Sequence, residues 1–201
     1  MEKNMKIVTD SSADIRELAG ADFASAPLKI ITADKEYVDD EALDVEGMVN
    51  DLASYKGRST TSCPNTADWL SAFGDAEEIF CVTITSGLSG SYNSAVVAAK
   101  AYLEEHPERK VRVVDSLSTG PEMRLIMEKI AELHREGRSF DEISEAIDGY
   151  KKTTGLIFML ESMRNLANNG RVSHLVAKFA GLLGIRVVAK ASDVGDIEPL
   201  M

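Results

Sequence analysis

The chain has 201 residues, 44% of them apolar and 27% charged, which is ordinary for a globular protein with a sizeable core. Its formal net charge of −11 repels polyanions and anionic membranes, so we expect no nucleic-acid partner. Because the first residues lack an apolar signal segment and no apolar run approaches ~18 residues, we expect a cytoplasmic protein without membrane insertion.

Short strand-like runs alternate with helical patterns up to Tyr150, which predicts an α/β fold with parallel strands. Strands are expected at 5–9, 26–32, 78–84 and 111–115. Helices are expected from Asp14, from a cap at Asp44 through Tyr55, over 91–105, from Pro121, and from a Ser139–Glu142 capping box through Tyr150.

The alternation changes in the last quarter of the chain. A strand at Gly155–Leu160 has no obvious partner, and a Gly/Asn-rich bend precedes a helix expected near 175–183. Two final strands are predicted to form a hairpin that turns at Gly195. We therefore place a soft boundary after residue 153, which gives an N-terminal α/β domain of residues 1–153 and a second domain of residues 154–201.

Four polar loops are candidates for a ligand site, because open parallel sheets bind ligands beyond the carboxyl ends of their strands. A single Ser, Thr or Asp before a helix usually only caps it. In the loop 85–91, however, we expect Ser91 to suffice as the cap, which leaves the hydroxyls of Ser86 and Ser89 available beside two glycines. Small hydroxyls next to helix amides suit a small anion. The four loops are 9–14, 58–66, 85–91 and 115–120.

A catalytic serine, a phosphate site and a carboxylate clamp all fit such a loop. A hydrolase elbow needs G-x-S-x-G, whereas here a glycine follows Ser89 directly. His106 and His134 lie in charged stretches and are interpreted as surface residues, and a structural role is favoured for His174. We expect no cofactor and no metal, since no nucleotide-binding glycine motif and no cluster with metal-ligand spacing occurs.

Six short motifs, in order, resemble those of the DegV proteins, a family of bacterial fatty-acid-binding proteins. The resemblance extends along essentially the whole chain. The motifs are IVTDSSADI near the start, PLKI in the second predicted strand, TTSCP at 60–64, SGLSGSYNSA at 86–95, VVDS at 113–116 and NNGRVS at 168–173.

The resemblance implies a DegV-like fold of two α/β domains that hold a long-chain fatty acid such as palmitate in a tunnel between them. By the same resemblance, the hydroxyls of Thr61 and Ser89 bind the carboxylate. We add Ser62, Ser86 and Gly90, which lie in the same two loops, as secondary candidates. The implied role is a carrier rather than an enzyme, and some members present the acid to a fatty acid kinase. A hydrolase or a phosphoryl-transfer enzyme using residues 86–91 is the alternative.

The chain departs from the family pattern in two places. Cys63 stands where members often carry Gln, and members continue past Met201 with further strands and a late histidine motif. On this basis we expect an incomplete second domain that self-associates through edge strands. Arg171 has two interpretations, as a residue that ties down the Gly170 bend or as one near the mouth of the ligand site.

Overall fold

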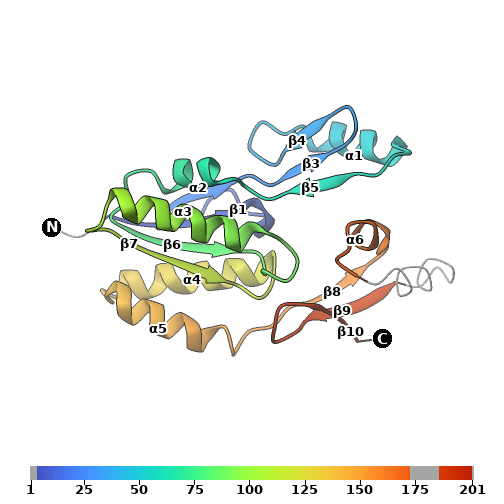
Figure 1. The fold of residues 1–201 in the computed structure, drawn as a ribbon. Helices are drawn as coiled ribbons and strands as arrows, with labels where there is room; N and C mark the ends of the chain where they lie inside the picture. The colour runs from blue at the N-terminus through green and yellow to red at the C-terminus, as the bar shows by residue number, and fades with distance from the viewer. Residues whose placement is uncertain (1–3, 173–185, 201) are drawn as a thin grey trace.

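The computed structural model describes residues 4–172 and 186–200. Its largest element is a parallel sheet with helices on both faces (Figure 1). The strand order is β2 (Asp22–Ala26), β1 (Met5–Asp10), β6 (Glu78–Thr83) and β7 (Lys110–Asp115). One face carries α2 (Thr66–Phe73) and α3 (Ser91–Glu105), and the other carries α4 (Pro121–Arg135) and α5 (Phe140–Tyr150).

The central strands β1 and β6 are buried on both faces, because successive apolar residues of each strand, such as Ile7 and Val8 of β1, are fully buried. Along β6, Phe80 packs towards α4 and α5, where its ring centroid lies 4.5 Å from that of Phe140. The neighbouring Ile79 and Cys81 pack on the opposite side, with Trp69 of α2. Successive side chains of a strand point to opposite faces, so this short strand contributes to both cores. Because all four strands run parallel, the loops that follow their carboxyl ends lie on the same side of the sheet.

Two small antiparallel sheets lie beyond the carboxyl ends of the parallel strands, one in the upper and one in the lower part of Figure 1. The first has the order β4 (Glu36–Val38), β3 (Lys29–Ile31) and β5 (Thr60–Ser62), and α1 (Val45–Ser54) accompanies it. The second has the order β10 (Ile197–Pro199), β9 (Val187–Ala191) and β8 (Ile157–Leu160), and α6 (Arg164–Asn168) follows β8 in the chain.

The structure confirms the predicted α/β class and most predicted elements. Helix α1 begins after the Asp44 cap, whose side chain accepts a hydrogen bond from the Gly47 amide at 2.9 Å. Helix α5 begins at the predicted capping box, and α4 has Pro121 in its first turn. The strand at Gly155–Leu160 finds its partner in β9, and β9 and β10 form the expected hairpin. The helix expected near 175–183 lies outside the described residues.

Two predictions near the N-terminus are wrong. No helix begins at Asp14, because Ser11–Ala13 form a single 3₁₀ turn that Asp14 ends in the left-handed conformation, with φ of 56°. The single strand predicted at 26–32 is divided, since β2 ends just before Pro27 and β3 begins two residues later in another sheet. Proline has no N–H to donate to a strand ladder, which accounts for the break. The prediction also missed β4, as well as β5, which lies inside the polar loop 58–66.

Candidate functional site

A pocket of about 790 Å³ lies where the carboxyl ends of the parallel strands meet the two small sheets. This volume is within the range of about 300–1,000 Å³ typical of small-molecule sites. Most of its wall is apolar and comes from both small sheets, α1 and the connecting loops, including Leu28, Ile30, Met48, Phe158, Leu160 and Ile197. Such a wall favours a ligand with a long apolar portion.

Thr61 and Ser89, the two predicted ligand residues, both line this pocket. Thr61 lies on β5, and Ser89 lies in the loop between β6 and α3. Arg171 connects them: its Nη2 donates to Thr61 Oγ1 at 2.8 Å, and its Nε donates to the carbonyl oxygen of Leu88 at 2.7 Å. The structure therefore brings two hydroxyls and one guanidinium together on the wall of a mainly apolar pocket.

Both hydroxyls act as acceptors for protein donors. Thr61 Oγ1 accepts from Arg171, and Ser89 Oγ accepts from the Ser91 amide at 3.2 Å, at the N-terminus of α3. Within the described residues, neither hydroxyl donates to a protein acceptor. A hydroxyl carries one donor in addition to its acceptor lone pairs, so each can donate to an anion. The helix N-terminus adds a positive dipole end.

Ser91 does not cap α3, contrary to our expectation. The N-cap is Gly90, and the Ser91 hydroxyl instead donates to the buried Asp10 carboxylate at 2.6 Å. The same carboxylate accepts from the Ile84 amide at 3.0 Å and from Ser12. Burial raises the pKa of Asp10, although the hydrogen bonds from Ser12, Ser91 and Ile84 oppose that rise. Asp10 thereby joins the first strand to the Ser89 loop, a role that sequence reasoning missed.

The three secondary candidates lie beside the pocket, and none is among its lining residues. The Ser62 hydroxyl donates to the Cys63 carbonyl at 3.1 Å. Ser86 is exposed, and its amide donates to the Asp115 carboxylate at 3.2 Å. A Cβ added at Gly90 would lie 3.3 Å from Cys63 Sγ, so this glycine allows the two loops to approach each other. Their contact with a ligand stays a prediction.

The two described histidines lie away from the pocket wall. His106 follows the last residue of α3, and His134 is in the last turn of α4. His174 lies outside the described residues. Over residues 4–172 and 186–200, no group of three or more His, Cys, Asp or Glu side chains could hold a metal ion. In the same part of the chain, no helix has the length and apolar character needed to cross a bilayer.

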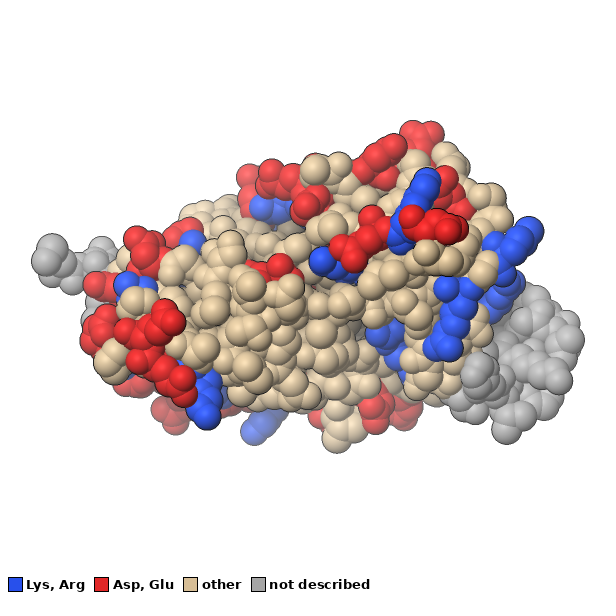
Figure 2. Space-filling view, turned by 45° about the horizontal axis from the view of Figure 1, so that its top comes forward, with Lys and Arg blue, Asp and Glu red and all other residues tan. Residues whose placement is uncertain are grey.

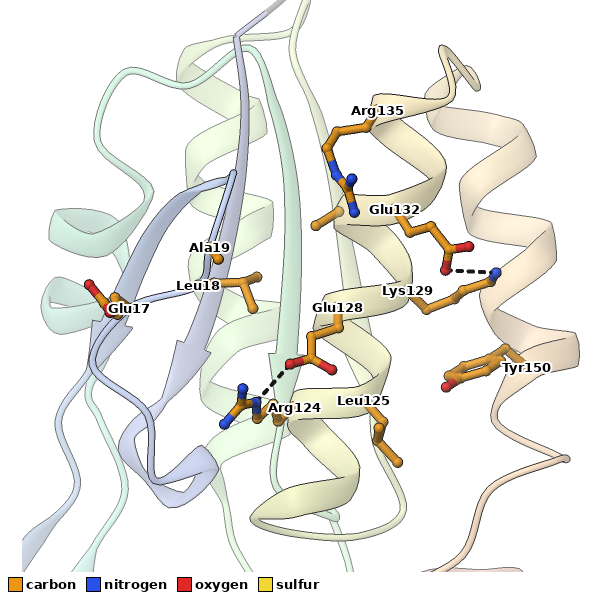
Figure 3. A pocket seen from close by; sticks show the side chains of 11 residues that line it. Glu17, Leu18, Ala19, Arg124, Leu125, Glu128, Lys129, Glu132, Arg135 and Tyr150 are labelled. Atoms are coloured by element: carbon orange, nitrogen blue, oxygen red, sulfur yellow. Dashed lines mark hydrogen bonds and ion pairs between the residues drawn. The ribbon is translucent and has the colours of Figure 1, made fainter.

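A second pocket of about 400 Å³ lies against α4 and has a different character (Figure 3). Four of its charged side chains form two ion pairs along the helix. Arg124 contacts Glu128 at 2.8 Å, and Lys129 contacts Glu132 at 2.9 Å. With Arg124 and Lys129 already paired, and with about half the volume, this pocket suits a long acyl chain less well than the site at Thr61 and Ser89.

The family model described as "Uncharacterised protein, DegV family" matches residues 4–201. The chain belongs to the DegV family. A DegV domain-containing protein of Streptococcus pneumoniae is 45% identical over 199 residues, which cover 97% of this chain and 71% of that protein.

Solved DegV structures share the fold closely. A DegV family protein from Eubacterium eligens, loaded with heptadecanoic acid, is 52% identical with a TM-score of 0.95. That match covers 98% of this chain and 71% of the other. The fatty acid kinase (Fak) B3 protein of Streptococcus pneumoniae, loaded with linoleic acid, is 44% identical with a TM-score of 0.95, over 98% of this chain and 72% of the other.

Proposed function

We propose that this DegV chain binds one long-chain fatty acid, with its carboxylate at Thr61, Ser89 and Arg171 and its tail along the apolar pocket. The observation that carries the proposal is the convergence of two donor hydroxyls and a guanidinium in a pocket of about 790 Å³ with a mainly apolar wall. The heptadecanoic and linoleic acids held by the similar proteins support the same ligand class.

The tail and the carboxylate contribute differently to the free energy of binding. A palmitate tail of ~14 methylenes is worth up to ~11 kcal/mol gross at ~0.8 kcal/mol for each buried CH₂. Hydrogen bonds to a charged group add ~1.5–3 kcal/mol each. The tail therefore supplies most of the affinity, and the polar cluster fixes which end of the ligand lies at Ser89.

The local charge is compatible with an anionic ligand despite the net charge of −11. Lys and Arg side chains gather at the end of the molecule that carries the small sheets, although acidic side chains are interspersed there (Figure 2). Arg171 adds a positive charge on the pocket wall itself. A charge-assisted hydrogen bond is roughly twice as strong as one between neutral groups, so Arg171 favours the ionised form of the acid.

We propose the role of a carrier rather than of an enzyme. The Ser89 hydroxyl accepts a hydrogen bond from a backbone amide, an arrangement that suits holding a ligand. By analogy with the Fak B3 protein, the partner would be a fatty acid kinase. The proposal places the carrier in the cytoplasm, as expected from the sequence. The proposal keeps the division after residue 153, and the ligand would then contact both parts, because residues on both sides of it line the pocket. The exposed Ile157 and Met159 of β8 support self-association as a further part of it.

Lipid extraction from the purified chain, followed by mass spectrometry, tests the ligand class. We expect a fatty acid of about 16–18 carbons, and we expect the delipidated chain to bind added palmitate in calorimetry. The absence of fatty acid in the extract, together with no heat on titration with palmitate, would contradict the proposal.

A further inference from the structure

Thr85 connects two parts of the chain that lie 110 residues apart. Its buried Oγ1 donates to the carbonyl oxygen of Gly195 at 3.0 Å and accepts from the Gly87 amide at 3.2 Å. Its own carbonyl oxygen accepts from the amides of Leu88 at 3.2 Å and Ser89 at 3.3 Å. One residue thus holds the β9–β10 turn through its side chain and the Ser89 backbone through its carbonyl.

The contact leaves no room for a side chain at Gly195. This glycine has a φ of +83°, and a Cβ added there would overlap the Thr85 hydroxyl and lie 3.1 Å from Leu117 Cα. From the other side, a Cβ at Gly87 would lie 2.8 Å from Asp196 Oδ1. The absence of a side chain at Gly87 therefore admits the β9–β10 turn to the loop 85–91.

The two joined parts belong to the same pocket. Gly195, Asp196 and Ile197 line it from the hairpin, and Thr85 and Ser89 line it from the β6–α3 loop. The hairpin is itself fixed, since the Gly195 amide donates to the Ser192 carbonyl at 2.9 Å and the Asp196 amide donates to Ser192 Oγ at 3.0 Å. The Thr85 hydrogen bonds therefore link the position of the hairpin to that of the loop that carries Ser89.

We propose that the Thr85–Gly195 contact positions Ser89, so that the docked β9–β10 turn sets the preference of the pocket for a carboxylate over a neutral head group. This proposal rests on the proposed fatty-acid binding. Hydrogen bonds weaken steeply as their geometry departs from linearity, so a small displacement of the loop removes the Ser89 contribution. Burial of the tail is non-directional and tolerates the same displacement. Thr85 is accordingly a positioning residue.

The test compares two ligands with the same tail, laurate and 1-dodecanol, by calorimetry on the full chain. Gly195→Ala forces the turn away from Thr85, and Thr85→Val removes the hydroxyl at nearly constant volume. Gly137→Ala is the matched control for backbone strain, because Gly137 has a φ of +78° and nothing within 4 Å of an added Cβ. Thr85→Ser restores the hydroxyl.

We expect the wild-type chain to bind laurate more tightly than dodecanol. In Gly195→Ala and Thr85→Val this ratio should fall by about tenfold, the worth of one weakened charged hydrogen bond, while the dodecanol affinity is retained. Gly137→Ala and Thr85→Ser should keep the wild-type ratio, even where the melting temperature falls. If Gly195→Ala does not fold, Thr85→Val carries the test.

An unchanged ratio of laurate to dodecanol affinity in folded Gly195→Ala or Thr85→Val would overturn the proposal. This includes the case in which both affinities fall by the same factor, which would show that Thr85 has only a structural role. A wild-type chain that binds neither ligand, or binds both equally, would contradict the proposed function itself. The two failures are therefore distinguishable in one data set.

Discussion

Arg171 donates a hydrogen bond to Thr61 across 110 residues of sequence, with 2.8 Å between Nη2 and Oγ1. The same side chain reaches the Leu88 carbonyl, so one guanidinium joins β5 to the Ser89 loop. Arg171 thus holds two ligand loops together and also lines the pocket. Of the two interpretations that the sequence left open, the contacts favour a place at the pocket, since within the described residues the side-chain hydrogen bonds of Arg171 go to Thr61 and Leu88 and not to the Gly170 bend.

Replacement of Arg171 is expected to weaken fatty-acid binding more than loss of either hydroxyl. Arg171→Gln removes the positive charge and loosens both loops, and a charged hydrogen bond alone is worth ~1.5–3 kcal/mol, or roughly 10- to 150-fold in affinity. Calorimetry with palmitate measures the change. Arg186→Gln is the control, because Arg186 forms an exposed ion pair with Glu161 at 3.4 Å and does not line the pocket. Equal affinities for the two variants would contradict a role of Arg171 in binding.

Thr61→Val and Ser89→Ala should each weaken palmitate binding by roughly 10- to 150-fold, because each removes one donor to the carboxylate. Neither change should unfold the protein, since Thr61 is exposed and Ser89 is partly buried. Thr60→Val is the matched control on the same strand, because Thr60 is exposed and does not line the pocket. Wild-type affinity for palmitate in both variants would contradict the proposal that Thr61 and Ser89 bind the carboxylate.

Local signals were enough to predict several elements. The caps at Asp44 and Ser139 and the proline at the start of α4 depend only on neighbouring residues, and the structure has all three. The three-residue strands β4 and β5 were not predictable in the same way, because each is defined by pairing with β3. A strand so short has no periodicity of its own to recognise.

The candidate site shows the same limit. The hydroxyls of Thr61 and Ser89 stand out in short motifs, but the residues that hold them are distant in sequence. Asp10 bonds Ser91 across 81 residues and Thr85 bonds Gly195 across 110. Buried hydrogen bonds between distant segments follow from the packing of the sheets, which a single sequence does not reveal.

The buried Asp10 should make stability depend on pH. Burial raises its pKa above 3.8, so the folded state holds this proton more strongly than the unfolded state. The stabilisation of the folded state by protonated Asp10 is complete below the pKa of the unfolded state. It is lost as the pH rises through the pKa of the folded state. Asp10→Asn cannot ionise, so its stability relative to the wild type should rise over that interval. Asp51 and Glu142, whose pKa values are lowered, are present in both proteins, so their effect on stability cancels in the difference between wild type and Asp10→Asn.

Urea denaturation of the two proteins, from about pH 3 to about pH 8, measures this difference. A stability difference that stays constant with pH, or that moves in favour of the wild type as the pH rises, would show that burial does not raise the pKa of Asp10.

Thr154→Val is expected to destabilise the fold by about 1–3 kcal/mol. Its Oγ1 donates to Glu122 Oε1 at 2.6 Å, and Glu122 is a buried carboxylate at the start of α4. Thr153→Val is the control in the neighbouring position, because that hydroxyl bonds the Tyr150 carbonyl in an exposed place and its loss should cost only a few tenths of that amount. Chemical denaturation of both variants checks the expectation, which fails if they lose equal stability.

A crystal structure of the chain with palmitate tests the central claim most directly. We predict that one carboxylate oxygen lies within hydrogen-bond distance of Thr61 Oγ1 and the other of Ser89 Oγ, with the tail along Ile30 and Phe158. A palmitate whose carboxylate lies at another part of the pocket, or whose tail lies outside it, would contradict the account.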